Sequence, residues 1–185
     1  MNQQIFYFLN NFALQYDRFD NLIVFCAQIL PFFLIAILLI YHLGRLQFSR
    51  SKNSWRDEPL WKEVFRKIFI MLGSTFLIWG FSQIINYFYY SPRPFLILEN
   101  INLLFTHGSG DSFPSGHATF FFTLAFMSYY YSPKWLYKLL LGGAIIVSFA
   151  RVISGVHWPL DILGALILSS IGVFVIRKIT PKRFK

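Results

Sequence analysis

The chain has 185 residues, of which 56% are hydrophobic and only 14% are charged, and its formal net charge is +9. Roughly a quarter of the residues of a soluble domain are charged, so this composition excludes an ordinary soluble protein and indicates an integral membrane protein. The positive charge does not indicate a nucleic-acid partner, because the basic residues gather between apolar runs, as they do in proteins that contact anionic lipid.

The first predicted element is a short helix within residues 1–20. Its apolar residues recur at helical spacing, namely Ile5, Phe8, Leu9, Phe12 and Tyr16. A helix with apolar residues on one face and polar residues on the other lies flat in the interface of a bilayer. We therefore expect an interfacial helix before the first membrane span.

Five apolar runs follow, and each is predicted to be a membrane-spanning helix, because crossing a bilayer takes about 20 residues. The predicted spans are residues 21–43, 68–90, 114–132, 135–153 and 158–177. The last two contain Lys138 and Asp161 near their ends, where a long side chain reaches the headgroups or a polar pocket holds a charge. The predicted fold class is therefore all-α: a single-domain, multi-pass membrane helical bundle with a basic cytoplasmic loop at residues 44–67.

The distribution of Lys and Arg predicts the orientation of the bundle. With five spans, 14 of the 17 basic residues fall on one side of the membrane. The positive-inside rule places these 14 in the cytoplasm. We therefore expect a protein of the cell (inner, cytoplasmic) membrane with its C-terminus in the cytoplasm. Two of the three outward basic residues are Arg93 and Arg151, so the candidate site below lies on the extracytoplasmic side.

Three outward segments carry groups suited to bind phosphate. Arg93 and Arg151 are planar, permanently charged side chains that grip a phosphate with two parallel hydrogen bonds. Ser115, Gly116 and His117 begin a predicted helix, where unpaired backbone N–H groups and the positive end of the helix dipole attract an anion. Gly116 also lets the backbone approach a ligand closely. The combination predicts an anion site at the outer membrane surface.

A carboxylate-backed histidine completes the set. His157 and Asp161 are four residues apart, and if Trp158 and Pro159 begin a helix, both side chains share one face. The carboxylate can then orient the imidazole and stabilise its cationic form. The alternative is that Asp161 only caps its helix and that the arginines only anchor helix ends at the headgroups.

The ordered motifs resemble those of the type-2 phosphatidic acid phosphatase superfamily over roughly residues 80–175. They are Arg93-Pro94, Pro114–His117 and the pattern Arg-x5-His-x3-Asp formed by Arg151, His157 and Asp161. Each motif alone is weak, but their ordered combination is specific. The resemblance implies a helical-bundle lipid phosphatase that needs neither a metal ion nor a cofactor.

The resemblance also implies a role for each matching residue. His157 would attack phosphorus to form a phosphohistidine, with Asp161 orienting the ring, and His117 would protonate the leaving group. The phosphoryl oxygens would be held by Arg93, Arg151, Ser115 and the backbone of Gly116. These roles amount to covalent catalysis with electrostatic stabilisation of the charge that builds on the phosphoryl oxygens.

Two positions depart from the superfamily pattern. Asn86 stands where the first motif has a lysine, seven residues before Arg93, and Ala150 stands where a serine precedes the third-motif arginine. An amide can donate a hydrogen bond but brings no charge. Either the substrate phosphate is bound more weakly, or a neighbour such as Tyr90 compensates, or the site takes a less negative substrate. Neither change touches the expected nucleophile or acid.

The resulting hypothesis is hydrolysis of a lipid phosphate or diphosphate presented at the outer leaflet, with undecaprenyl diphosphate as the first choice. Phosphatidylglycerophosphate or lipid A phosphatase activity is the alternative. A non-catalytic protein that binds or translocates a lipid phosphate is the alternative of another class. The expected partners are the lipid substrate and the bilayer; no nucleic acid and no protein partner are implied. A metal hydrolase is a weaker option, because no metal-ligand spacing recurs.

Overall fold

The computed structural model describes residues 1–48, 60–106 and 110–180. Its elements are α1 (Asn2–Asn10), α2 (Asp17–Val24), the π-helical turn η1 (Phe25–Ile29), α3 (Leu30–Phe48), α4 (Leu60–Phe88), α5 (Pro94–Ile97), α6 (Gly116–Tyr131), α7 (Lys134–Ile153) and α8 (Pro159–Ile179). Within these described ranges, β-structure is limited to an isolated bridge between Pro92 and Asp111. The predicted all-α fold class is therefore confirmed.

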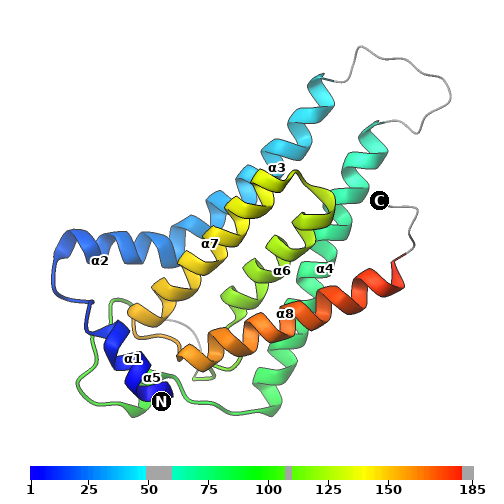
Figure 1. The fold of residues 1–185 in the computed structure, drawn as a ribbon. Coiled ribbons are helices and arrows are strands. Elements are labelled where there is room, and N and C mark those ends of the chain that lie inside the picture. Colours follow the sequence, from blue (N-terminus) through cyan, green and yellow to red (C-terminus); the bar gives the residue numbers. More distant parts are fainter. Residues whose placement is uncertain (49–59, 107–109, 181–185) are drawn as a thin grey trace.

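Four stretches of helix in the described part of the chain are long and apolar enough to cross a membrane: Asp17–Leu46, Leu60–Phe88, Lys134–Ile153 and Pro159–Ile179. α6 has 16 residues, fewer than the roughly 20 that crossing a bilayer takes. It lies at the centre of the bundle against α4, α7 and α8 (Figure 1), and most of its residues are buried. The protein is thus a multi-pass membrane bundle, whereas the number of five spans stays a prediction.

The N-terminal region differs from the expected helix over residues 1–20. α1 ends at Asn10, and α2, which begins at Asp17, already belongs to the first candidate span. Between them, Leu14 has a φ of 60°, and its N–H donates to the Asp20 carboxylate at 3.0 Å. The left-handed backbone at Leu14 ends helical propagation, and an acidic residue in the first turn favours a new helix start.

The first candidate span changes direction between α2 and α3 (Figure 1). The two helices are joined by η1, and Pro31 follows in the first turn of α3. Proline has no N–H, so the carbonyl of Ala27, four residues earlier, loses its helical partner and the helix kinks. The kink brings Ile23 and Ala27 into a small apolar cluster with Ala150 near the end of α7.

Helical structure extends into both ends of the segment predicted as a loop, residues 44–67. α3 and α4 both reach into it, and residues 49–59 lie outside the described part of the chain. In α4, Glu63 and Lys67 form an ion pair one turn apart, and such pairs stabilise a helix where apolar contacts are few. Hydropathy marks where the apolar sequence ends, and the helices continue beyond that point.

The main hydrophobic core surrounds α6. Leu124 and Met127 of α6 and Met71 of α4 are fully buried in one cluster. Close packing of α4 on α8 depends on Gly172, where a Cβ atom would lie 2.6 Å from the Ile78 side chain. Small residues allow such close approach between membrane helices, whose association relies on van der Waals contact.

α1 is fastened to one end of the bundle by polar and apolar contacts. The Asn10 side chain donates to the carbonyls of Asn102 and Ile153 at 2.7 and 2.8 Å and accepts from the backbone N–H of Asn102 at 2.8 Å. Phe6 is buried against Trp158, with ring centroids 5.2 Å apart. α1 therefore packs on the ends of α7 and α8 (Figure 1), in addition to presenting exposed apolar residues.

The two ends of the bundle have different contents (Figure 1). We call one the α1 end, where α1, α5, the starts of α6 and α8 and the last turn of α7 meet. We call the other the opposite end, which holds the turn from α6 to α7 and the C-terminal half of α8. The predicted site residues belong to elements of the α1 end, apart from Asn86, which lies in the last turn of α4.

Candidate active site

Asp161 lies in the first turn of α8 and makes two contacts there. Its Oδ2 accepts from the backbone N–H of Trp158 at 2.8 Å and from His157 Nδ1 at 3.2 Å. Trp158 is the N-cap and Pro159 the first helical residue, a position that suits the fixed φ and missing N–H of proline. Asp161 thus both caps α8 and holds the imidazole, so the two interpretations weighed from the sequence hold together.

Arg93 contacts the other nitrogen of the same ring. Its Nη1 lies 3.2 Å from His157 Nε2 and 2.9 Å from the carbonyl oxygen of Val156. A guanidinium can only donate, so Nε2 accepts and the ring proton sits on Nδ1, facing Asp161. The Nε2 lone pair of a ring that is 2% exposed is thereby directed at a fixed cation.

The chain around Arg93 is tied to the start of α8. Trp158 Nε1 donates to the carbonyl oxygen of Pro92 at 2.9 Å, and the isolated bridge pairs Pro92 with Asp111. Burial lowers the pKa of Arg93 below its ordinary value, whereas the nearby carboxylates of Asp161 and Asp111 raise it. Because a guanidinium is not deprotonated in proteins, the side chain is cationic at neutral pH.

Arg151, in the last turn of α7, is almost completely buried, with 1% of its surface exposed. Its Nε and Nη2 are buried and have no hydrogen-bond partner in the described residues, and its Cζ lies 5.5 Å from the centroid of the Phe105 ring. Arg93 is close enough to repel it electrostatically. Two neighbouring buried cations, of which Arg151 has donors without a partner in the described residues, are costly unless an anion joins them, which indicates an anion site.

α6 begins as predicted, with Ser115 as its N-cap. The Ser115 side chain accepts from the backbone N–H of Ala118 at 3.5 Å, and Thr119 Oγ1 donates to the carbonyl oxygen of Ser115 at 2.9 Å. The backbone N–H of Ser115 donates to the carbonyl oxygen of Asp161 at 3.2 Å. This backbone bond joins the starts of α6 and α8 and places Ser115 beside the His157–Asp161 pair.

Gly116 faces side chains of α4 that sequence reasoning missed. A Cβ atom at Gly116 would lie 3.1 Å from Gln83 Nε2 and 3.2 Å from Trp79 Nε1. Asn86 lies one further turn along the same face of α4, and its buried Oδ1 has no hydrogen-bond partner among the residues the structure describes. Trp79, Gln83 and Asn86 are spaced four and three residues apart, so they lie on one face of a helix. This spacing is the sequence signal that could have identified Trp79 and Gln83 as neighbours of the site.

His117 lies in the first turn of α6 and is partly buried. It lines a cavity of about 240 Å³ that α6 forms with α4 and the kinked first span, together with Trp79, Phe120 and Pro31. Most of the lining is apolar. The structure therefore brings Arg93, His157, Asp161 and Ser115 into direct contact, and the placement of His117 opposite His157 stays a prediction.

A further missed residue is Ser112. It is fully buried, and its hydroxyl has one proton, which it donates either to the carbonyl oxygen of Ser91, at 3.1 Å, or to the nearby Asp161 carboxylate. Its signal in the sequence is weak, because a serine shortly before a helix start is common. When its proton turns to Asp161, Ser112 is a further donor to the carboxylate that holds His157.

Together, the fold and the site define an all-helical membrane protein with a buried arginine and histidine centre at one end of its bundle. The model of a family described as the PAP2 superfamily matches residues 66–185, a range that contains every predicted site residue. The chain belongs to the PAP2 superfamily. This membership and the relatives below confirm the predicted class of enzyme, a membrane lipid phosphatase.

Two relatives and one solved structure are similar to the chain. The bacitracin transport permease protein BcrC of Bacillus licheniformis is 28% identical over 185 residues, which cover 98% of this chain and 82% of that protein. The putative undecaprenyl-diphosphatase YbjG of Escherichia coli K12 is 40% identical over 108 residues, which cover 57% of this chain and 52%, about half, of that protein. The crystal structure of Aquifex aeolicus LpxE matches with a TM-score of 0.67 at 25% identity, over 96% of this chain and 94% of that one.

Proposed function

We propose that the protein hydrolyses undecaprenyl diphosphate at the extracytoplasmic face of the membrane, with His157 as the nucleophile. The observation that carries the proposal is the pair of contacts on its ring, Asp161 at Nδ1 and Arg93 at Nε2. A nucleophilic nitrogen with its tautomer fixed, beside two buried guanidinium groups, suits attack on phosphorus. The similarity to a putative undecaprenyl-diphosphatase supports the choice of substrate.

In the first step, Nε2 of His157 attacks the terminal phosphorus, and the bond from phosphorus to the bridging oxygen breaks. When substrate binds, the Arg93 N–H that donates to Nε2 in this structure donates to a phosphoryl oxygen instead. The donors of Arg151 that have no partner in the described residues donate to phosphoryl oxygens as well. These donors stabilise the charge that builds on the oxygens. Asp161 stabilises the ring as it becomes cationic, and His117 gives its proton to the leaving undecaprenyl phosphate.

In the second step, water attacks the phosphohistidine, the N–P bond breaks and inorganic phosphate leaves. His117, now neutral, takes one proton from the water and returns to its starting state. Ser115 and the backbone N–H of Gly116 hold phosphoryl oxygens at the start of α6, where the helix dipole favours negative charge. Asn86 offers an amide in place of a lysine cation, so the balance of positive charge rests on the two arginines.

Activity is tested with purified protein in detergent, in EDTA, because the described residues contain no group of three or more metal-ligating side chains. The substrates are undecaprenyl diphosphate, phosphatidylglycerophosphate and lipid A. We expect phosphate release with the highest kcat/KM for undecaprenyl diphosphate, and an acid-labile, alkali-stable radiolabel on the protein. His157→Ala abolishes both.

The matched control is His42→Gln, which alters a buried histidine at the opposite end whose Nε2 contacts the Ser132 hydroxyl at 2.9 Å. The His42→Gln variant should have the same kcat as the native protein when activity is expressed per amount of folded protein. Undiminished turnover in His157→Ala would refute the mechanism. Lipid-phosphate binding without turnover in the native chain would favour the non-catalytic alternative, and a higher kcat/KM for another lipid would refute the substrate.

The location of the site is tested by labelling single cysteines from outside intact cells. With Cys26 replaced by serine, Glu99→Cys reports the α1 end and Lys134→Cys the opposite end; both native side chains are exposed. An impermeant maleimide should label the cysteine at 99 and not that at 134, as the positive-inside rule requires. The reverse pattern would place the site in the cytoplasm.

A further inference from the structure

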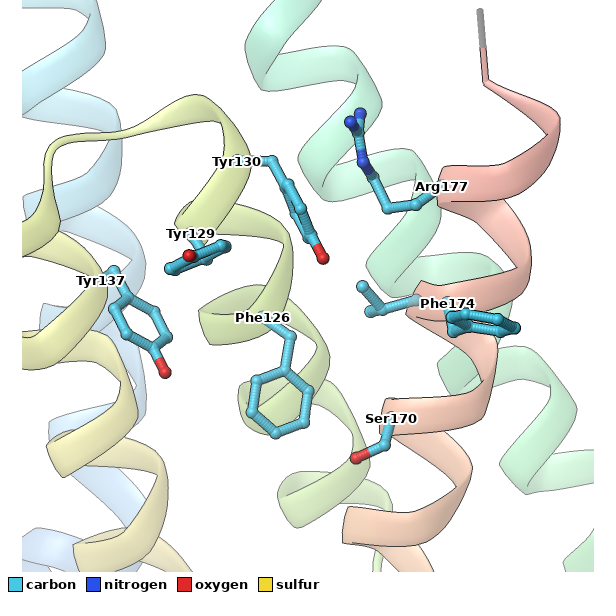
Figure 2. A pocket seen from close by; sticks show the side chains of 8 residues that line it. Phe126, Tyr129, Tyr130, Tyr137, Ser170, Phe174 and Arg177 are labelled. Atoms are coloured by element: carbon cyan, nitrogen blue, oxygen red, sulfur yellow. The ribbon is translucent and has the colours of Figure 1, made fainter. Parts of the chain in front are cut away.

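A second pocket, which the proposed chemistry does not use, lies at the opposite end of the bundle. It is a groove of about 310 Å³ between α6, α7 and α8 (Figure 2). We call it the tyrosine groove. The lining residues that matter below are Phe126, Tyr129, Tyr130, Tyr137, Ser170 and Arg177.

Arg177 is positioned by neutral aromatic partners. Its Cζ lies 4.3 Å from the centroid of the Tyr130 ring, and its Nη1 donates to the Tyr131 hydroxyl at 2.9 Å. Its Nε is buried without a hydrogen-bond partner in the described ranges. The ion pairs found in the same ranges, Glu63 with Lys67 and His157 with Asp161, do not involve it. The guanidinium is therefore fixed in place while the described residues leave its charge uncompensated.

The groove has a charged end and an apolar wall. Arg177 and Ser170 are seven residues apart on α8, which corresponds to about 10 Å along the helix. Figure 2 shows Arg177 toward one end and Ser170 toward the other, with Phe126, Tyr129 and Tyr137 along the side. The rings of Tyr129 and Tyr137 pack edge to face, with centroids 5.2 Å apart, and such a pair makes part of this wall rigid. The groove is thus complementary in shape and charge to an amphiphile with an anionic head.

We propose that the tyrosine groove binds one anionic phospholipid, with the lipid phosphate at Arg177 and an acyl chain along Phe126 toward Ser170. The phosphate supplies the negative charge that Arg177 lacks among its described neighbours, and arginine binds phosphate with directed hydrogen bonds. A zwitterionic lipid binds less well, because its own ammonium group offsets the attraction. Basic residues at helix ends typically meet anionic lipid in the cytoplasmic leaflet, which is the leaflet that the positive-inside rule assigns to this end.

The proposal is tested by native mass spectrometry of the full chain in detergent, with phosphatidylglycerol and phosphatidylcholine of identical acyl chains. We expect phosphatidylglycerol adducts to exceed phosphatidylcholine adducts by about tenfold, or about 1.4 kcal/mol, because the ammonium group of phosphatidylcholine offsets part of the attraction between the phosphate and Arg177. Arg177→Gln should remove this preference. Lys134→Gln makes the same change of charge at an exposed residue of the same end and should keep it.

A second variant tests the acyl-chain position without touching the charge. Ser170→Phe fills the end of the groove distant from Arg177 and should lower phosphatidylglycerol binding several-fold. Its thermal unfolding temperature should equal that of the native protein, which shows that the variant is folded. Equal adducts with both lipids, or a preference unchanged by both variants, would overturn the proposal.

The active site is the obvious competing location for a lipid phosphate. Arg151→Gln removes a cation there and should leave the phosphatidylglycerol preference intact. Loss of the preference in Arg151→Gln but not in Arg177→Gln would place the lipid in the active site and overturn the assignment. Displacement of the lipid by millimolar inorganic phosphate would identify a small-anion site and overturn it as well.

Discussion

The two ends of the bundle hold the same chemical group, a guanidinium, in opposite ways. At the α1 end, Arg151 is 1% exposed and its neighbours include a second cation, Arg93. At the opposite end, Arg177 is only partly buried and is stacked on the ring of Tyr130. The cations of the α1 end are thus buried away from water, whereas the cation of the opposite end is accessible to water and to lipid headgroups.

The difference shows what each end requires of a ligand. Coulomb interactions strengthen as the local dielectric falls, and a buried cation without a partner is costly. The α1 end therefore gains most from a ligand that brings several oxygens into a fixed geometry. Binding of an anion stabilises the opposite end less, since solvent already compensates part of the charge of Arg177. Substitutions should thus have large effects on chemistry at one end and small effects at the other.

The largest effect is expected for Asp161→Asn. The amide oxygen in the place of Oδ2 can still accept from the N–H of Trp158 and from His157 Nδ1, but the neutral amide no longer stabilises the ring as it becomes cationic. We therefore expect kcat to fall by about 10³-fold. A thermal unfolding temperature close to the native value, measured with the kinetics, would separate this cause from misfolding. Near-native kcat would contradict the role of Asp161.

Arg151→Gln should have the next largest effect, a loss of about 10² to 10³-fold in kcat, because it removes donors that act on developing charge in a buried site. Arg177→Gln, the matched change at the opposite end, serves as its control. Comparison of kcat and KM decides the assignment. An increase in KM alone would mean that Arg151 binds the ground state and the transition state equally.

Gly116→Ala should have an intermediate effect, about tenfold in kcat/KM. Its Cβ would lie 3.1 Å from Gln83 Nε2 and 3.2 Å from Trp79 Nε1, so these side chains must move by a few tenths of an ångström, and small misplacements near a reaction centre are costly. The double variant Gly116→Ala/Gln83→Ala should recover part of the activity. No recovery would show that the backbone of α6, and not the α4 side chain, is what the methyl group disturbs.

Asn10→Ala tests how the α1 end is held together. It removes hydrogen bonds to Asn102 and Ile153 from a side chain that is 1% exposed, which should destabilise the fold by about 1 to 3 kcal/mol. A lower midpoint of unfolding, with kcat changed only a few-fold, is the expected result. Asn11→Ala, at an exposed neighbour, should leave the midpoint unchanged.

The smallest effect on catalysis is expected for Arg177→Gln. In detergent without added phospholipid, kcat and KM should stay within about twofold of native values, because Arg177 belongs to the end of the bundle away from His157 and surface charges contribute little. A large loss of kcat under these conditions would show that the two ends are coupled and would remove the basis of the comparison.

The parts of the site that the sequence predicted are those governed by local spacing. His157 and Asp161 meet because Trp158-Pro159 starts a helix. Ser115 caps α6 because its hydroxyl stands directly before the first helical residue, Gly116. The contact of Arg93 with His157 joins residues 64 apart in the chain, and no periodic pattern predicts it. The positive-inside rule placed these segments on one side of the membrane, and the resemblance to a superfamily with an ordered set of motifs then assigned them to one site.

The missed features depend on contacts without a period or on helix beyond the apolar layer. Asn10 and Asn102 are 92 residues apart, and an asparagine in a short amphipathic helix gives no sign of such a partner. The extension of α3 and α4 into residues 44–67 was missed because the spans were bounded by hydropathy. The kink after η1 had a readable signal in Pro31, which the apolar run around it concealed.

The backbone bond from Ser115 N–H to the carbonyl oxygen of Asp161 has an evolutionary consequence. A main-chain contact is insensitive to which side chains surround it, so the spacing between the two helix starts of the proposed site can survive extensive sequence drift. The wall of the cavity beside His117, by contrast, consists of replaceable side chains such as Phe120. Substitutions in that wall can therefore change the shape of the cavity over evolutionary time without disturbing the contact between the two helix starts.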